Sequence, residues 1–96
     1  MLENMHDMHY IIVISYEEQM PKIHAIGAIE IVIYFNEHGV PHVHAIAAEF
    51  EAKIAIEDAM VIAGSLPHAQ LRQVRRWVLA NQTSLIEKWN QYTDRK

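Results

Sequence analysis

The stretch HVHAIAAEFEAKIAI, residues 42–56, decides the fold of this 96-residue chain. Over residues 50–56, apolar side chains alternate with charged or small ones, which is typical of a strand with one face in a core. Residues 42–47 are also strand-like, and only Ala48 and Glu49 separate the two runs. So short a link predicts an antiparallel hairpin, because parallel strands need a long crossover between them.

Further strand-like runs lie on both sides of this hairpin. The other predicted strands are residues 10–15, 23–26, 29–35 and 60–63. Glycine, proline or short polar runs separate them, as is usual for the turns between strands. Because most of the links are short, we expect one antiparallel sheet of about five or six short strands.

The sequence changes to a helical period after residue 64. We expect Ser65 to cap a first helix, with Pro67 in its first turn. Ser84 and Glu87 form a capping-box pattern that predicts the start of a second helix. Apolar residues recur at helical spacing and predict the buried stripes, with both tryptophans in the core: Leu71, Val74, Trp77, Val78, Leu85, Ile86 and Trp89.

Together these patterns predict an α+β domain, in which an antiparallel sheet is followed by two C-terminal helices packed on one face. We assign residues 20–96 to this single domain and residues 1–19 to an N-terminal extension with one strand. Two helices cover only one face of such a sheet. The other face is therefore expected to be solvated or used for association.

The composition limits the possible functions. The chain has no cysteine, which excludes disulfides, thiolate metal sites and cysteine nucleophiles. The formal net charge is −4, so contact with nucleic acid would need a local basic patch. No run approaches the roughly 20 apolar residues of a membrane helix, and the first residues lack the basic region of a signal peptide. We therefore expect a cytoplasmic protein, most simply from a bacterium.

The segment with the most chemical potential is HGVPHVH, residues 38–44, which holds three histidines. Imidazole titrates near neutral pH and is the commonest metal ligand. On a strand, His42 and His44 share one face at a spacing of about 6–7 Å along the backbone. His38 can fold back from the preceding loop to join them, and Pro41 stiffens the backbone before the pair.

Three interpretations of this segment remain open. In the first, the rings line a solvated sheet face and hydrogen-bond locally. In the second, His42, His44 and His38 are catalytic acid/base groups. In the third, a divalent metal ion binds His38, His42 and His44, although no resident cofactor is assigned. Other candidates for a third metal ligand are nearby carboxylates: Glu37, Glu49 and Glu51.

A basic cluster lies on the first predicted helix. Arg72, Arg75 and Arg76 are spaced i, i+3 and i+4 and so share one side of it. We interpret them as candidate nucleic-acid-binding residues that contact phosphates, the alternative being a solvated helix face. Beside His42 and His44, such a cluster would suit RNA cleavage, with one imidazole as base, the other as acid and cations on the phosphate.

The sequence resembles the small bacterial proteins of domain of unknown function family 4160 over about residues 20–89. The resemblance rests on Met20-Pro21-Lys22-Ile23, on IVIYFNEHGVPHVH at residues 31–44, and on Leu66-Pro67 before a helix that ends near Trp89. The family usually shows two prolines before the second histidine, and Val40 replaces the first of them here. Residues 1–19 lie outside the resemblance.

The resemblance implies a role in a two-gene module. Family members are often encoded beside a small protein of unknown-function family 2442, which can carry a DNA-binding helix-turn-helix region. This pairing is similar to a toxin–antitoxin module and implies that the present chain is the toxin-like member, with the protein encoded nearby as its partner.

Three functional hypotheses follow. The first is a toxin-like protein that acts on RNA as a ribonuclease, through His42 and His44. The second is a non-enzymatic protein-binding module that pairs through its sheet with a partner chain or with itself. The third is a histidine-based metal-binding protein.

Overall fold

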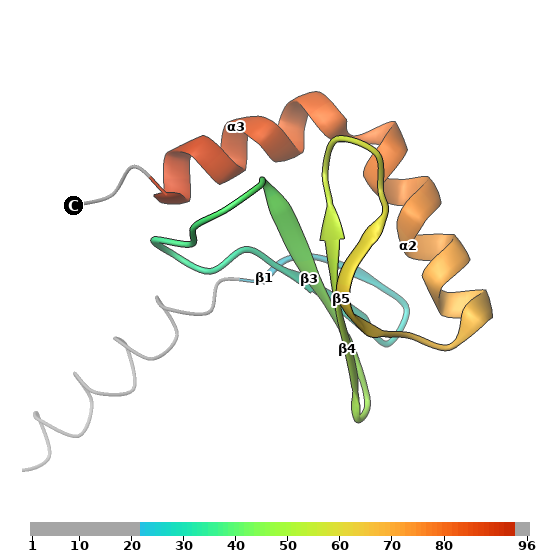
Figure 1. Ribbon diagram of the computed structural model, residues 1–96. Coiled ribbons are helices and arrows are strands. Elements are labelled where there is room, and N and C mark those ends of the chain that lie inside the picture. Colours follow the sequence, from blue (N-terminus) through green and yellow to red (C-terminus); the bar gives the residue numbers. More distant parts are fainter. Residues whose placement is uncertain (1–21, 94–96) are drawn as a thin grey trace, which may run out of the picture.

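The computed structural model describes residues 22–93, whose five strands form one antiparallel sheet in the order β1-β2-β3-β4-β5 (Figure 1). The strands are β1 (Lys22–Ile26), β2 (Ile29–Val32), β3 (His42–Ala47), β4 (Phe50–Ala55) and β5 (Val61–Ser65). Helices α2 (His68–Ala80) and α3 (Gln82–Thr93) follow. The predicted α+β class and the order of elements are confirmed. The predicted strand at residues 10–15 lies outside the described residues.

Several predicted element boundaries differ from the structure. Strand β2 ends at Val32 instead of residue 35, because the chain leaves the sheet there and enters the loop at residues 33–41. Ser65 is not a helix cap: it is the last residue of β5 and pairs with Glu51 of β4. Pro67 takes the N-cap position of α2 and provides no side-chain hydrogen bond there.

The second helix begins three residues earlier than its capping-box pattern predicts, at Gln82 instead of Leu85. Only Asn81 separates α2 from α3, and Ser84 lies inside α3. The side-chain amide of Gln82 donates hydrogen bonds to the carbonyl oxygens of Ile56 and Glu57, at 2.9 and 2.7 Å. The start of α3 is therefore fixed by a contact with the end of β4, which the local sequence pattern does not contain.

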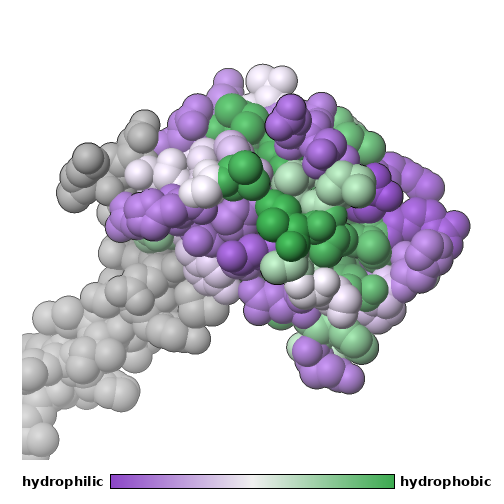
Figure 2. Space-filling view, in the orientation of Figure 1, coloured by the Kyte–Doolittle hydropathy of each residue, from purple (hydrophilic) through white to green (hydrophobic). Residues whose placement is uncertain are grey.

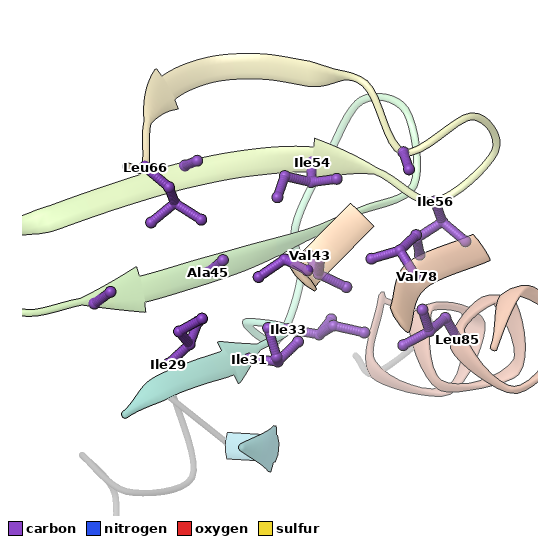
Figure 3. Close-up of a cluster of buried hydrophobic side chains, with 14 of the residues drawn as sticks. Ile29, Ile31, Ile33, Val43, Ala45, Ile54, Ile56, Leu66, Val78 and Leu85 are labelled. Carbon is purple, nitrogen blue, oxygen red and sulfur yellow. The ribbon is translucent and has the colours of Figure 1, made fainter. Parts of the chain in front are cut away.

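The core lies between one face of the sheet and the two helices (Figure 3). Alternate residues of β2, β3 and β4 point into it, and Val74 and Val78 of α2 and Leu85 of α3 are fully or almost fully buried. Trp89 is buried as predicted. Trp77 is only partly buried, because its ring stacks on His24 of β1 at the margin of the core, with ring centroids 4.5 Å apart.

Both edge strands of the sheet carry an irregularity in their pairing. In β1, Ile23 is an extra residue between Lys22 and His24, which pair with consecutive residues of β2. In β5, Ile62 is an extra residue opposite β4. Bulges of this kind are common on edge strands, where they bend the exposed backbone away from other chains. Neither helix within residues 22–93 is long and apolar enough to cross a membrane.

Candidate functional site

His42 and His44 lie on the face of β3 opposite to the core residues Val43 and Ala45, as the alternation of a strand requires. Both histidines are nevertheless buried, with exposed fractions of 3% and 5%. The ring of Tyr34 lies edge-on to His44, with centroids 4.4 Å apart. The two imidazole rings also contact each other, with centroids 5.0 Å apart.

The loop at residues 33–41, which connects β2 to β3, is anchored to the C-terminal end of α3 (Figure 1). The backbone N–H of Asn36 donates to the carbonyl oxygen of Tyr92 at 3.2 Å, and Phe35 packs edge-on against the Tyr92 ring. Asn36 has a φ of 61°, a left-handed conformation that asparagine tolerates better than most residues. These contacts hold the loop, and with it Glu37, close to the start of β3.

Glu37 bridges the two imidazoles with a single carboxylate oxygen. Its Oε1 atom lies 3.1 Å from Nε2 of His42 and 2.5 Å from Nε2 of His44. The Glu37 side chain is 21% exposed, whereas the two rings are almost inaccessible. Glu37 therefore lies between the buried pair and the solvent.

The remaining ring nitrogens also have partners. Nδ1 of His42 donates to the carbonyl oxygen of Val40 at 2.8 Å, since a carbonyl can only accept a hydrogen bond. Nδ1 of His44 lies 2.9 Å from Oε2 of Glu51, and an ionised carboxylate likewise only accepts. Nε2 of each ring faces Oε1 of Glu37, and because Nδ1 already carries a proton, a hydrogen bond from Nε2 to this carboxylate requires the doubly protonated ring.

Opposing effects act on the ionisation of Glu37. Burial raises the pKa of this carboxyl group, while hydrogen bonds and positive charge from His44 and then His42 lower it. The combined effect of the two histidines is larger than that of burial, and the pKa of Glu37 lies below its ordinary value. The group that bridges the two rings is therefore a carboxylate at neutral pH.

The donor atoms of Glu37, His42 and His44 all lie within 4.8 Å of one another and form the metal-ligand group found among residues 22–93. The structure thus brings together two of the three predicted catalytic residues. His38 is exposed and lies outside this group. Its neighbour Glu37, which was also a candidate for the third metal ligand, lies beside the two histidines instead.

The three arginines are not brought next to the histidines. Arg75 donates from Nε to the carbonyl oxygen of Ala59 at 2.8 Å, while Arg72 and Arg76 are exposed. Figure 1 shows α2 at the other side of the molecule from the loop at residues 33–41. The arrangement of a basic cluster beside the paired histidines is therefore absent from the described part of the chain.

Lys53 is a candidate residue that the sequence analysis missed. It pairs with His44 across β3 and β4 and is partly buried. Together with Glu51, Ala63 and Gly64 it lines a shallow hollow of about 270 Å³ on the same side of the sheet. This placement could be predicted from the two-residue turn between β3 and β4. The length of the turn sets the register of the two strands and so puts Lys53 opposite His44.

Comparison with known proteins gives a family and nothing more specific. A family model described as a domain of unknown function (DUF4160) matches residues 28–90, about two thirds of the chain. The matched segment contains every residue of the histidine cluster. No curated protein and no solved structure matches the chain.

Proposed function

Because the chain belongs to the DUF4160 family, we propose that it is the toxin-like member of a bacterial two-gene module and acts on RNA in the cytoplasm. The observation that carries this proposal is the buried cluster of His42, His44 and Glu37. The donor atoms of these three side chains lie within 4.8 Å of one another, and both imidazoles are buried. Such groups are the ones that enzymes use on phosphate esters.

The geometry assigns different parts to the two nitrogens of each ring. The Nδ1 atoms of His42 and His44 are held by Val40 and Glu51, so the Nε2 atoms and Glu37 are the groups that would act on a scissile phosphate. Lys53, next to His44 in the sheet register, would be the cation that contacts an anionic substrate, and it shares the adjoining hollow with Glu51. Arg72 and Arg76 are exposed and available to the backbone of a longer RNA.

The first experiment is growth of a bacterial culture on induction of the chain. The wild type is compared with the His42→Ala/His44→Ala double variant and with His68→Ala, an exposed histidine at the start of α2. We expect the wild type and His68→Ala to inhibit growth and the double variant not to do so. Circular dichroism must show that the double variant is folded, because both substituted residues are buried.

The outcome of the growth experiment decides whether RNA cleavage is measured next. If the folded double variant loses growth inhibition, RNA from induced cells is examined for cleavage. Growth inhibition that persists in the folded double variant would contradict a role for the histidine cluster. If the wild type does not inhibit growth, the toxin-like function itself is wrong.

A non-enzymatic protein-binding module is the second candidate, and the surface at strand β5 favours it. All five residues of β5 are exposed. Met60, Val61 and Ile62 expose 54%, 37% and 47% of their surface. Figure 2 shows apolar side chains gathered near the middle of the view, where Figure 1 shows the β4–β5 hairpin. Apolar surface that groups in this way is typical of a protein-binding site.

This candidate is tested by co-expression with the small protein encoded nearby. A stable stoichiometric complex in size-exclusion chromatography is expected, and Ile62→Lys is expected to weaken it at least tenfold. Leu79→Lys is the matched control, because Leu79 on α2 is similarly exposed, at 50%. Equal weakening by both substitutions, or no complex with the wild type, would contradict binding through β5.

A further inference from the structure

We propose that Glu37, His42 and His44 form a binding site for a divalent transition-metal ion of the Zn²⁺ class. The ligand atoms would be Oε1 of Glu37 and Nε2 of each histidine. Three side chains from a loop and one strand converge on a single point, and their donor atoms lie within 4.8 Å of one another. This proposal deepens the proposed function. It rests on that function only for the reaction that the bound ion would assist, and not for metal binding itself.

The orientation of the two rings supports the proposal. In metal sites, a ligating histidine usually donates its other ring N–H to a carboxylate or a backbone carbonyl, which fixes the ring and its tautomer. Both forms occur here: His42 donates from Nδ1 to the Val40 carbonyl and His44 donates from Nδ1 to Glu51. Both Nε2 atoms face Oε1 of Glu37, where a metal ion would take the place of the ring protons.

The distances fit an ion of this size. Zinc–nitrogen and zinc–oxygen distances of about 2.0–2.2 Å in a tetrahedral site place neighbouring ligand atoms about 3.3 Å apart. The separation of Glu37 Oε1 and His42 Nε2 is already 3.1 Å. Binding requires Glu37 Oε1 to move away from His44 Nε2, now at 2.5 Å, by less than about 1 Å. A side chain on a loop can make this movement by a small rotation.

The charges around the site also favour a cation. Glu37 and Glu51 both contact the imidazoles, and no lysine or arginine within residues 22–93 forms an ion pair with either carboxylate. The two carboxylates can place two negative charges beside the rings, and Lys53, which lines the hollow next to Glu51, forms no ion pair with them within residues 22–93. A divalent ion would neutralise them.

The donor set indicates the class of ion. Two imidazole nitrogens and one carboxylate oxygen suit zinc, iron, cobalt or manganese, whereas calcium and magnesium prefer oxygen ligands alone. Only three protein ligands are present in the group, which leaves a coordination position for water or a substrate oxygen. That position would open toward Glu37, the most exposed of the three ligands. A bound ion of this kind polarises phosphate oxygens and activates water.

The test measures metal binding directly, without reference to growth or RNA. Full-length, untagged protein is stripped with a chelator, dialysed against Zn²⁺ and analysed for metal content. Co²⁺ is then titrated with absorption spectroscopy as the readout. All proteins carry His6→Ala and His9→Ala, so that the two histidines near the N-terminus do not contribute. We expect one equivalent of Zn²⁺ per chain and a visible Co²⁺ spectrum.

Three variants distinguish this site from general binding to histidines. Glu51→Gln should weaken metal affinity by roughly 10–100-fold, since it alters the partner of a ligand and not the ligand itself. Glu37→Gln preserves the shape of the side chain and should weaken affinity further, while His68→Ala should leave it unchanged. The proposal would be overturned by less than one equivalent of Zn²⁺ in the protein that carries only the His6→Ala and His9→Ala substitutions. An unchanged affinity for Zn²⁺ in folded Glu37→Gln would also overturn it.

The metal site and the proposed function fail in different ways. Stoichiometric metal without growth inhibition would contradict the toxin-like function and leave the metal site intact. Growth inhibition that depends on the histidines, in a protein that binds no metal, would overturn the metal site and leave the function intact.

Discussion

At the scale of single residues, the four hydrogen bonds of His42 and His44 define the site. Each ring is held at Nδ1 by its own acceptor and at Nε2 by the shared carboxylate of Glu37. No buried side-chain nitrogen or oxygen within residues 22–93 lacks a hydrogen-bond partner. Removal of Glu51 would therefore leave one buried ring nitrogen unpaired and removal of Glu37 would leave two, at a cost of about 1–3 kcal/mol for each nitrogen.

Gly64 shows how much one residue on β5 can constrain the sheet. Its φ is +75°, and a β-carbon at this position would lie 2.1 Å from the carbonyl oxygen of Glu51. We predict that Gly64→Ala lowers the free energy of unfolding by about 3 kcal/mol or more, from the left-handed backbone and the steric overlap together. Urea unfolding followed by circular dichroism measures this change.

Gly27 provides the matched control for this prediction. Its φ is +58°, but nothing lies within 4 Å of an added β-carbon. Gly27→Ala should therefore cost only the backbone term of about 1–2 kcal/mol. Equal losses for the two variants would show that the contact with Glu51 does not constrain the strand pair.

At the scale of elements, the loop at residues 33–41 is the segment that turns a strand with two histidines into a cluster. Strand β3 by itself presents His42 and His44, and the loop adds Glu37 above them. The loop can do so because α3 holds it at Tyr92. The site thus depends on an element that lies more than fifty positions away in the sequence.

The junction of α2 and α3 allows a direct comparison of two candidate starts for α3. Gln82 makes two hydrogen bonds to the end of β4, whereas Ser84 is exposed inside the helix. We predict that Gln82→Ala lowers the free energy of unfolding by about 1–3 kcal/mol, and that Ser84→Ala changes it by less than about 0.5 kcal/mol. Thermal or urea unfolding of the two variants measures the difference. A larger loss for Ser84→Ala would restore the capping box as the start of the helix.

At the scale of the whole molecule, the two sides of the sheet carry different groups of side chains. One side supplies the core with the helices, and the other holds the histidine cluster and the hollow at Glu51 and Lys53. The two sides are in contact at one point, because the centroid of the His42 ring lies 5.0 Å from that of Trp89, a core residue of α3. The cluster also connects the loop to the sheet, so that its occupancy should influence the stability of the whole domain.

This connection predicts a metal-dependent stability. If Zn²⁺ binds the folded chain only, a concentration of 100 times the dissociation constant should raise the free energy of unfolding by about 2.7 kcal/mol. A chelator should reverse the increase, and Glu37→Gln should not show it. Urea unfolding with and without Zn²⁺ measures the effect. An equal increase in Glu37→Gln would place the ion elsewhere on the chain.

The sequence by itself determined the sheet and the orientation of the histidine pair. Alternation over residues 50–56 and the two-residue turn before them are local features, and they suffice to specify an antiparallel hairpin with His42 and His44 on one face. The period change after Gly64 likewise specified two helices after the sheet. These features were predictable because backbone geometry alone sets them.

Only the tertiary structure decided which side chains complete the site. Glu37 and His38 are adjacent in the sequence and both were candidates, but the path of the loop, fixed by Tyr92 of α3, directs Glu37 toward the rings. Ser65 had the chemistry of a cap, yet pairing with Glu51 keeps it in β5. Contacts between distant segments override local preferences in both cases, because their energies depend on the folded neighbours and not on the adjacent sequence.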